Sequence, residues 1–152
     1  MIRVQRDDID IGAELAALTG DNHRIGGIAT FIGTMRDLSD GQSVSAMTLE
    51  HYPGMTEKQL DAIDREARNR WALEASLIVH RYGRFTPGDR IVFVATAAPH
   101  RQDALDSCAF LIDWLKTKAP FWKLEETGDG ARWVDARDSD TAATARWGDA
   151  PK

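Results

Sequence analysis

Positively charged side chains gather at both ends of one predicted helix, residues 102–118. His100 and Arg101 lie where an apolar run gives way to this helix, and Lys116 and Lys118 lie in its last turn. Ligands often bind at such strand ends, and helix N-termini favour anions, so the first pair could bind an anion. Lysines at a helix C-terminus complement the helix dipole. From spacing alone, this ordinary structural role is favoured for Lys116 and Lys118.

Two further cations lie outside that helix. Lys123 follows it beyond a proline, and Arg36 follows the run Phe31-Ile32-Gly33-Thr34-Met35 at the end of a predicted strand. An arginine in that place could hold a phosphate through two parallel hydrogen bonds. An ordinary surface arginine, paired with Asp37 or Asp40, explains the same residues at least as well.

The common catalytic signatures are absent from the sequence. It contains no Gly-Lys dipeptide, so a P-loop is excluded, and it has neither a G-x-G-x-x-G fingerprint nor an H-E-x-x-H motif. No serine stands in a G-x-S-x-G elbow. The single cysteine, Cys108, excludes an internal disulfide and a cysteine-cluster metal site. The absence of these motifs excludes several classes of enzyme and does not indicate any other class.

Periodicity predicts the elements that must position these side chains. Apolar residues recur at helical spacing after Thr56 and Gln59, which form a capping-box pattern, and again within residues 102–118. A short helix is predicted at residues 10–18, with Asp10 as its N-cap. The predicted strands cover residues 25–32, 44–52, 75–82 and 91–98, and a hairpin pairs residues 121–126 with 131–135. This mixed order favours an α+β or α/β fold.

Composition indicates one folded domain. The chain has 152 residues, of which 43% are hydrophobic and 28% charged, and we expect a single domain over residues 1–137 with a polar tail over 138–152. The net charge of −5 argues against a globally basic nucleic-acid binder. No apolar run approaches the roughly 20 residues that span a bilayer, and the first residues do not resemble a signal peptide. We therefore expect a cytoplasmic protein that binds neither membrane nor nucleic acid.

Four longer motifs carry a more specific signal. In chain order they are Phe31-Ile32-Gly33-Thr34-Met35-Arg36, Leu49-Glu50-His51-Tyr52-Pro53-Gly54-Met55, the stretch from Pro99-His100-Arg101 to Lys116 and Lys123, and Arg132-Trp133-Val134-Asp135-Ala136-Arg137. Together they resemble the large, catalytic subunit of molybdopterin synthase, the MoaE family. The resemblance covers roughly residues 25–147.

The resemblance implies an α+β fold of the α/β hammerhead type, with a mixed sheet, two main amphipathic helices and a C-terminal hairpin. It implies a homodimer in which each protomer binds a small ubiquitin-like sulfur carrier, giving a heterotetramer. The enzyme would be a sulfurtransferase of molybdenum cofactor biosynthesis. Sulfur would pass from the carrier's C-terminal Gly-Gly thiocarboxylate to cyclic pyranopterin monophosphate and form the dithiolene of molybdopterin. This subunit would need no metal or redox cofactor.

The same resemblance implies the site. Lys116 and Lys123 would be catalytic, and the substrate-binding positions would be Thr34, Met35, Arg36, His100, Arg101, Lys116, Lys123, Leu124 and Glu125. We hypothesise that Lys116 engages the thiocarboxylate as an acid, a base or a transient acceptor. Neighbouring cations and exclusion of water would lower its pKa from about 10.4. Two departures from the family are the acidic pair after Leu124 and the acidic stretch that follows Arg36.

Two other functions fit parts of this pattern. A non-catalytic module could keep the dimer and bind the carrier without turnover, although it would have no chemical need for both Lys116 and Lys123. A phosphate-ester or nucleotide-binding enzyme could use the same basic pocket, but the absent phosphate-binding motifs argue against it. The sequence does not decide whether His100 or Arg101 of one protomer completes the pocket of its neighbour.

Overall fold

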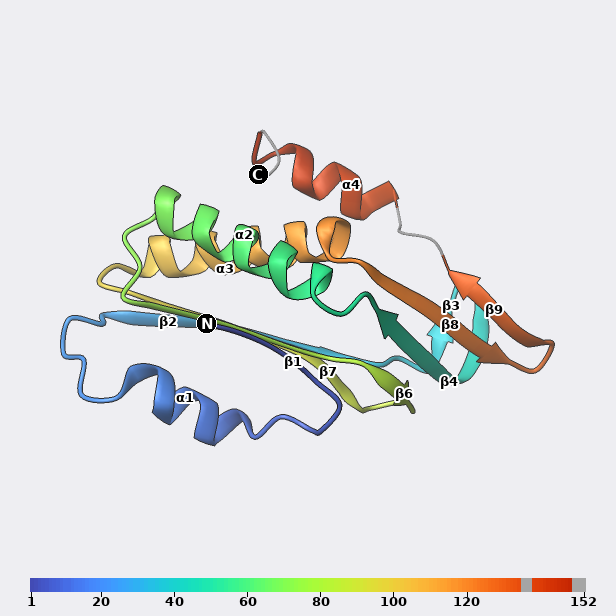
Figure 1. Cartoon of the computed structure of the whole chain (residues 1–152). Helices are drawn as coiled ribbons and strands as arrows, with labels where there is room; N and C mark the ends of the chain where they lie inside the picture. Colours follow the sequence, from blue (N-terminus) through green and yellow to red (C-terminus); the bar gives the residue numbers. More distant parts are fainter. Residues whose placement is uncertain (135–137, 149–152) are drawn as a thin grey trace.

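The computed structural model describes residues 1–134 and 138–148, and its centre is a four-stranded mixed sheet (Figure 1). The strand order is β1 (Ile2–Gln5), β5 (Ala75–Arg81), β7 (Arg90–Ala98) and β2 (Gly27–Thr34). β1 runs parallel to β5, and the other neighbours are antiparallel. The strands predicted at residues 25–32, 75–82 and 91–98 are confirmed.

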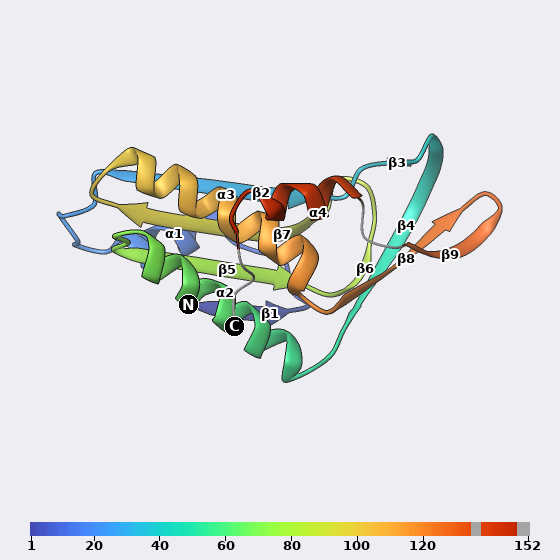
Figure 2. The same cartoon turned by 90° about the horizontal axis from the view of Figure 1, so that it is seen from above.

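Helices cover both faces of this sheet. α2 (Met55–Arg70) and α3 (Arg101–Lys118) lie side by side on one face, and α1 (Ile11–Thr19) lies on the other (Figures 1 and 2). Side chains of β5 and β7 alternate between the two faces. Ile78 packs in the cluster that contains α2 and α3, and Val79 packs in the cluster with α1. A strand buried on both faces has an uninterrupted apolar sequence, which is the pattern that residues 91–98 show.

A second sheet extends from one end of the first. It orders β3 (Leu38–Ser39), β4 (Gln42–His51), β8 (Phe121–Thr127) and β9 (Gly130–Val134), and β6 (Gly83–Phe85) also pairs with β4. The hairpin of β8 and β9 is the predicted one, although Asp135 lies outside the described residues. The expected architecture of a mixed sheet, two main helices and a hairpin is therefore confirmed.

The start of α2 differs from its prediction. The pattern of Thr56 and Gln59 predicts the cap at Thr56, but the N-cap is Gly54, whose N–H donates to Glu57 Oε2 at 2.6 Å. Thr56 is buried, and its hydroxyl donates to the carbonyl of Tyr52 at 2.9 Å. The helix begins earlier because Gly54 adopts a φ of 85°, which glycine tolerates without steric cost.

The C-terminal segment packs onto the domain through α4 (Asp138–Ala145) and Trp147. The Trp147 ring lies 5.7 Å from that of Trp71 and 5.6 Å from that of Phe110, and its Nε1–H donates to Asp113 Oδ2 at 2.7 Å. A domain over residues 1–137 with a separate tail stays a prediction. Within the described ranges, no helix is long and apolar enough to cross a membrane.

Candidate functional site

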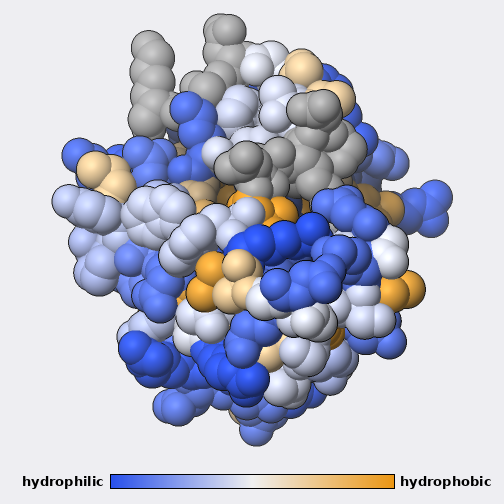
Figure 3. Space-filling view, turned by 90° about the vertical axis from the view of Figure 1, so that its right-hand side faces the viewer, coloured by the Kyte–Doolittle hydropathy of each residue, from blue (hydrophilic) through white to orange (hydrophobic). Residues whose placement is uncertain are grey.

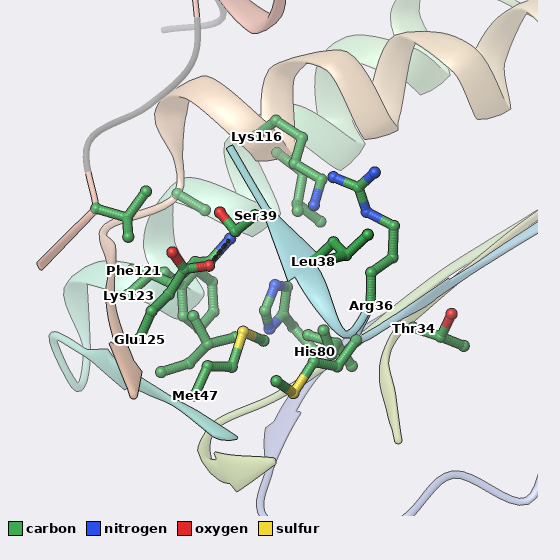
Figure 4. A pocket seen from close by; sticks show the side chains of 16 residues that line it. Thr34, Arg36, Leu38, Ser39, Met47, His80, Lys116, Phe121, Lys123 and Glu125 are labelled. Atoms are coloured by element: carbon green, nitrogen blue, oxygen red, sulfur yellow. Dashed lines mark ion pairs between the residues drawn. The ribbon is translucent and has the colours of Figure 1, made fainter. Parts of the chain in front are cut away.

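A pocket of about 390 Å³ opens where the two sheets meet, below the C-terminal end of α3 (Figure 4). Its lining comes from the end of β2 and the residues after it, from β3, β4 and β5, from the last turn of α3, and from β8. Figure 3 faces this end of the molecule and shows hydrophobic side chains set among hydrophilic ones. The fold thus gathers segments from most of the chain at one place.

Three of the predicted cations line this pocket. Arg36 follows β2, Lys116 lies in the last turn of α3, and Lys123 lies on β8. Figure 4 shows the Arg36 and Lys116 side chains on the same side of the cavity. Positive charge from three separate elements therefore faces one space, as binding of an anionic ligand requires.

The end of β2 is held in place by backbone hydrogen bonds. The N–H of Met35 donates to the Asp89 carbonyl at 2.9 Å, and the N–H of Gly88 donates to the Met35 carbonyl at 2.8 Å. Met35 is buried, whereas Thr34 and Arg36 are exposed. The predicted positions Thr34, Met35 and Arg36 all line the cavity, and the buried methionine anchors the arginine next to it.

Glu125 balances the charge of Lys123. Its side chain is only 3% exposed and lies 3.4 Å from Lys123 Nζ and 3.4 Å from a guanidinium nitrogen of Arg132. Alternate residues of a strand face the same way, so Lys123 and Glu125 share the cavity face of β8 and Leu124 points to the opposite face. Leu124 is thus not among the described residues that line the pocket.

His100 and Arg101 lie at the other end of α3. Arg101 is the first residue of this 18-residue helix, and His100 is its N-cap. A rise of 1.5 Å per residue places the backbone of Arg101 about 22 Å from that of Lys116 along the axis. Within one chain, the structure therefore does not bring His100 and Arg101 to the pocket that contains Lys116.

The sequence did not indicate His80, which lines the cavity from β5. It is 4% exposed, its Nδ1 lies 2.8 Å from the Arg81 carbonyl, and its ring stacks on Phe121 with centroids 3.8 Å apart. Burial, together with the charges of Lys116 and His51, lowers the pKa of His80 from 6.5 to about 3. The signal that could have revealed His80 is a polar residue inside a strand that is otherwise apolar.

Ser39 was also missed. It lines the cavity, is 4% exposed, and its hydroxyl has no hydrogen-bond partner among the described residues. Arg132 donates to the Ser39 carbonyl at 3.4 Å and so holds this residue beside Glu125. A buried hydroxyl without a partner costs roughly 1–3 kcal/mol, so this group is suited to bind a polar ligand.

The described residues contain no group of three His, Cys, Asp or Glu side chains that could hold a metal ion. Cys108 is buried in the core on α3, and burial raises the pKa of its thiol to about 11. A thiol in that state is a poor nucleophile. Besides the Glu125 carboxylate, which pairs with Lys123, the cavity offers cations, a neutral imidazole and a hydroxyl.

Comparisons with known proteins agree with one another. The family model described as "MoaE protein" matches residues 4–118. The molybdopterin synthase catalytic subunit of Ralstonia nicotianae is 56% identical over 147 residues, which are 97% of this chain and 84% of that protein. A solved structure, the molybdopterin biosynthesis MoaE protein from Burkholderia ambifaria, is 58% identical with a TM-score of 0.84 and covers 99% of each chain.

A more distant structure shares the fold. The protein–protein complex of subunits 1 and 2 of molybdopterin-converting factor from Helicobacter pylori contains a chain that is 17% identical, with a TM-score of 0.73. The similarity covers 90% of the present chain and 91% of that one. With these neighbours, the fold type that the sequence motifs implied is confirmed.

Proposed function

The chain belongs to the MoaE protein family, and from this premise we propose that it is the catalytic subunit of a molybdopterin synthase. It is then a sulfurtransferase of molybdenum cofactor biosynthesis that uses the thiocarboxylate of a small carrier protein and cyclic pyranopterin monophosphate. The observation that carries this proposal is a single cavity into which three elements bring Arg36, Lys116 and Lys123.

Charge explains why both ligands fit this cavity. The substrate carries a phosphate and the carrier ends in a negative thiocarboxylate, so each needs cations and hydrogen-bond donors. Arg36 is exposed at the edge of the cavity and suits the phosphate, with Thr34 and Met35 beside it. Lys116 suits the thiocarboxylate, and Lys123 assists with its charge balanced by Glu125.

Sulfur transfer requires that charge be stabilised while bonds change. In each of two transfers, the carrier's sulfur forms a bond to a substrate carbon in place of an oxygen, and hydrolysis by water breaks the carrier's carbon–sulfur bond, so that the carrier ends as a carboxylate. Negative charge on sulfur or oxygen at these steps is stabilised by an ammonium at the cavity wall. We assign this role to Lys116.

His100 and Arg101 belong to the proposal through the homodimer. They cannot reach the cavity of their own chain, but they lie beside β2, an edge strand of the first sheet that no other described strand covers. Ile28 and Ile32 on this strand are 45% and 40% exposed, and such apolar surface suits a subunit interface. We propose that the two residues contribute to the pocket of the partner protomer.

The carrier completes the assembly. The Helicobacter pylori structure is a complex of two subunits of molybdopterin-converting factor, which supports a small carrier subunit as the partner here. A cytoplasmic location is part of the same proposal. It is supported by a single buried cysteine, because a chain with one cysteine forms no internal disulfide.

The decisive experiment is reconstituted sulfur transfer with thiocarboxylated carrier and cyclic pyranopterin monophosphate. We expect product from the wild type, and at least about 100-fold less from Lys116→Ala if the lysine stabilises developing charge. Lys118→Ala is the matched control, since Lys118 lies in the same helical turn but is not among the described cavity residues. If folded wild-type protein binds the carrier but gives no product, the proposed sulfurtransferase activity is overturned and the non-catalytic binding module is favoured.

A further inference from the structure

His80 is held rigidly at the base of the cavity. Its ring stacks on Phe121 with an interplanar angle of 19°, and β5, on which it lies, is paired on both sides by β1 and β7. The residue is only 4% exposed, so its ring is packed among protein atoms. The orientation of the imidazole is therefore set by the fold before any ligand arrives.

One hydrogen bond determines which nitrogen of His80 carries the proton. The Arg81 carbonyl, 2.8 Å from Nδ1, can only accept, so Nδ1 carries the hydrogen. The buried ring is neutral because burial disfavours its charged form. A neutral imidazole with hydrogen on Nδ1 has a lone pair on Nε2, and this nitrogen is an acceptor.

The charged groups around the ring indicate what this acceptor meets. Lys116 lies above His80 in the cavity (Figure 4), and its charge acts on the ring. His51 also acts on the ring of His80. The centroid of the His51 ring lies 6.1 Å from that of Phe121, on which His80 stacks. Glu125 is already engaged by Lys123. An ammonium donor and an imidazole acceptor thus line the same cavity.

Building on the function proposed above, we propose that His80 is a positioning residue for Lys116. Its Nε2 accepts a hydrogen bond from the Lys116 ammonium and directs that group toward the anionic end of the carrier. An ammonium has three hydrogens, so this bond leaves others for the ligand. A lysine has a long flexible side chain, and one fixed acceptor holds its ammonium in the orientation that stabilises the charge developing during sulfur transfer.

The contact itself is tested without turnover, by ¹⁵N NMR of the imidazole in the full-length protein. We expect hydrogen on Nδ1 and none on Nε2 from pH 5 to 9, and a change of the Nε2 shift in Lys116→Met. A ring with hydrogen on Nε2, or an Nε2 chemical shift that is unchanged in Lys116→Met, would overturn the proposal. This NMR measurement remains decisive even if the protein proves inactive in sulfur transfer.

Kinetics then separate positioning from packing. His80→Phe keeps a ring to stack on Phe121 but has no acceptor, and we expect kcat to fall 10- to 100-fold with KM and carrier affinity nearly unchanged. His80→Gln offers an amide oxygen near the place of Nε2 and should recover most of kcat. Equal losses in both variants, or full activity of His80→Phe, would refute positioning.

His51 provides the matched control for these variants. It contacts the same Phe121 ring, but its Nδ1 lies 3.1 Å from Thr56 Oγ1 and it is not among the described cavity residues. His51→Gln should therefore leave kcat within about twofold of the wild type. A loss of kcat in His51→Gln as large as that in His80→Phe would show that the aromatic cluster as a whole, rather than the acceptor, matters.

Discussion

Lys123 and Glu125 lie two residues apart on β8, with their charged atoms 3.4 Å apart at the wall of the cavity. The carboxylate also meets Arg132 at the same distance, so one buried anion balances two cations. Removing it would leave those cations facing each other, and the loss of a buried partner costs far more than the loss of an exposed one.

Glu125→Gln should therefore destabilise the protein. We expect the free energy of unfolding to fall by about 1–3 kcal/mol, because the cations are partly exposed and solvent screens part of the loss. Urea unfolding measures this. Glu126→Gln is the control: its partner Arg84 lies 3.2 Å away at the surface, and the change should stay within about 0.5 kcal/mol. Equal losses would contradict the central role of Glu125.

Arg36→Lys should weaken substrate binding without affecting stability. Arg36 is exposed, and lysine keeps the charge but loses the paired hydrogen bonds to phosphate. Loss of about 1.4 kcal/mol corresponds to a tenfold rise in KM for the substrate, with an unchanged melting temperature. Steady-state kinetics give the answer, with Arg65→Lys on the exposed side of α2 as control. An unchanged KM would remove Arg36 from the phosphate site.

A mixed dimer tests whether Arg101 serves the partner's pocket. A dimer of one Lys116→Ala protomer and one Arg101→Ala protomer has one intact pocket if the sites are shared, and none if each site uses its own chain. We expect about half of the wild-type activity from differently tagged, co-purified protomers. Activity no higher than that of either parent homodimer would show that Arg101 does not act across the interface.

Gly26→Ala should be severely destabilising. A Cβ at this position would lie 2.0 Å from the carbonyl oxygen of Pro99, where the start of β2 approaches the loop before α3. Because the obstacle is backbone, we expect a loss of about 2–4 kcal/mol in unfolding free energy. Gly128→Ala meets no atom within 4 Å and should change it by less than about 0.5 kcal/mol. Similar melting temperatures for the two variants would contradict this.

Acid should destabilise the protein through His80. The pKa of its ring is lowered from 6.5 to about 3, so between these values the unfolded chain binds a proton that the folded ring does not. The free energy of unfolding must then fall as pH is lowered through this range, by up to about 1.4 kcal/mol per pH unit from this residue. Urea unfolding from pH 7 to 4 should show a shallower fall in His80→Gln. Identical slopes would refute the buried neutral state.

The titration of Asp8 does not affect the comparison between the wild type and His80→Gln. Arg90 hydrogen-bonds to its carboxylate and lowers its pKa to about 2, so its contribution is lost only as pH falls below about 4 toward 2. Asp8 is unchanged in His80→Gln, so its effect is common to both proteins.

Local pattern was enough to predict most elements. β7 and α3 are nearly the ranges that the apolar runs indicate, since burial on both faces or on one helical face imposes a period that the sequence must show. The predicted N-cap of α2 was wrong. Gly54, with its positive φ, competes with Thr56 for this position, and the sequence pattern alone does not show which residue caps the helix.

The candidate site was only partly predictable. Lys116 and Lys123 are only seven residues apart, on either side of Ala119-Pro120. Both belong to one sequence motif, so their common place in the pocket could be predicted from the sequence. Leu124 was assigned from the same motif, but strand alternation turns its side chain away from the pocket. A motif identifies a stretch of chain, whereas the pleat decides which of its side chains point into the pocket.

The sequence by itself determined most of the elements, the family and three cations of the pocket, Arg36, Lys116 and Lys123, because each follows from a pattern of residues that are close along the chain. Only the tertiary structure decided that His80 and Ser39 line the same space as Lys116, and that the Leu124 side chain does not. Those relations depend on which strands pair, in what register, and on which face of each strand a side chain lies. They arise from contacts between distant segments, which no local pattern records.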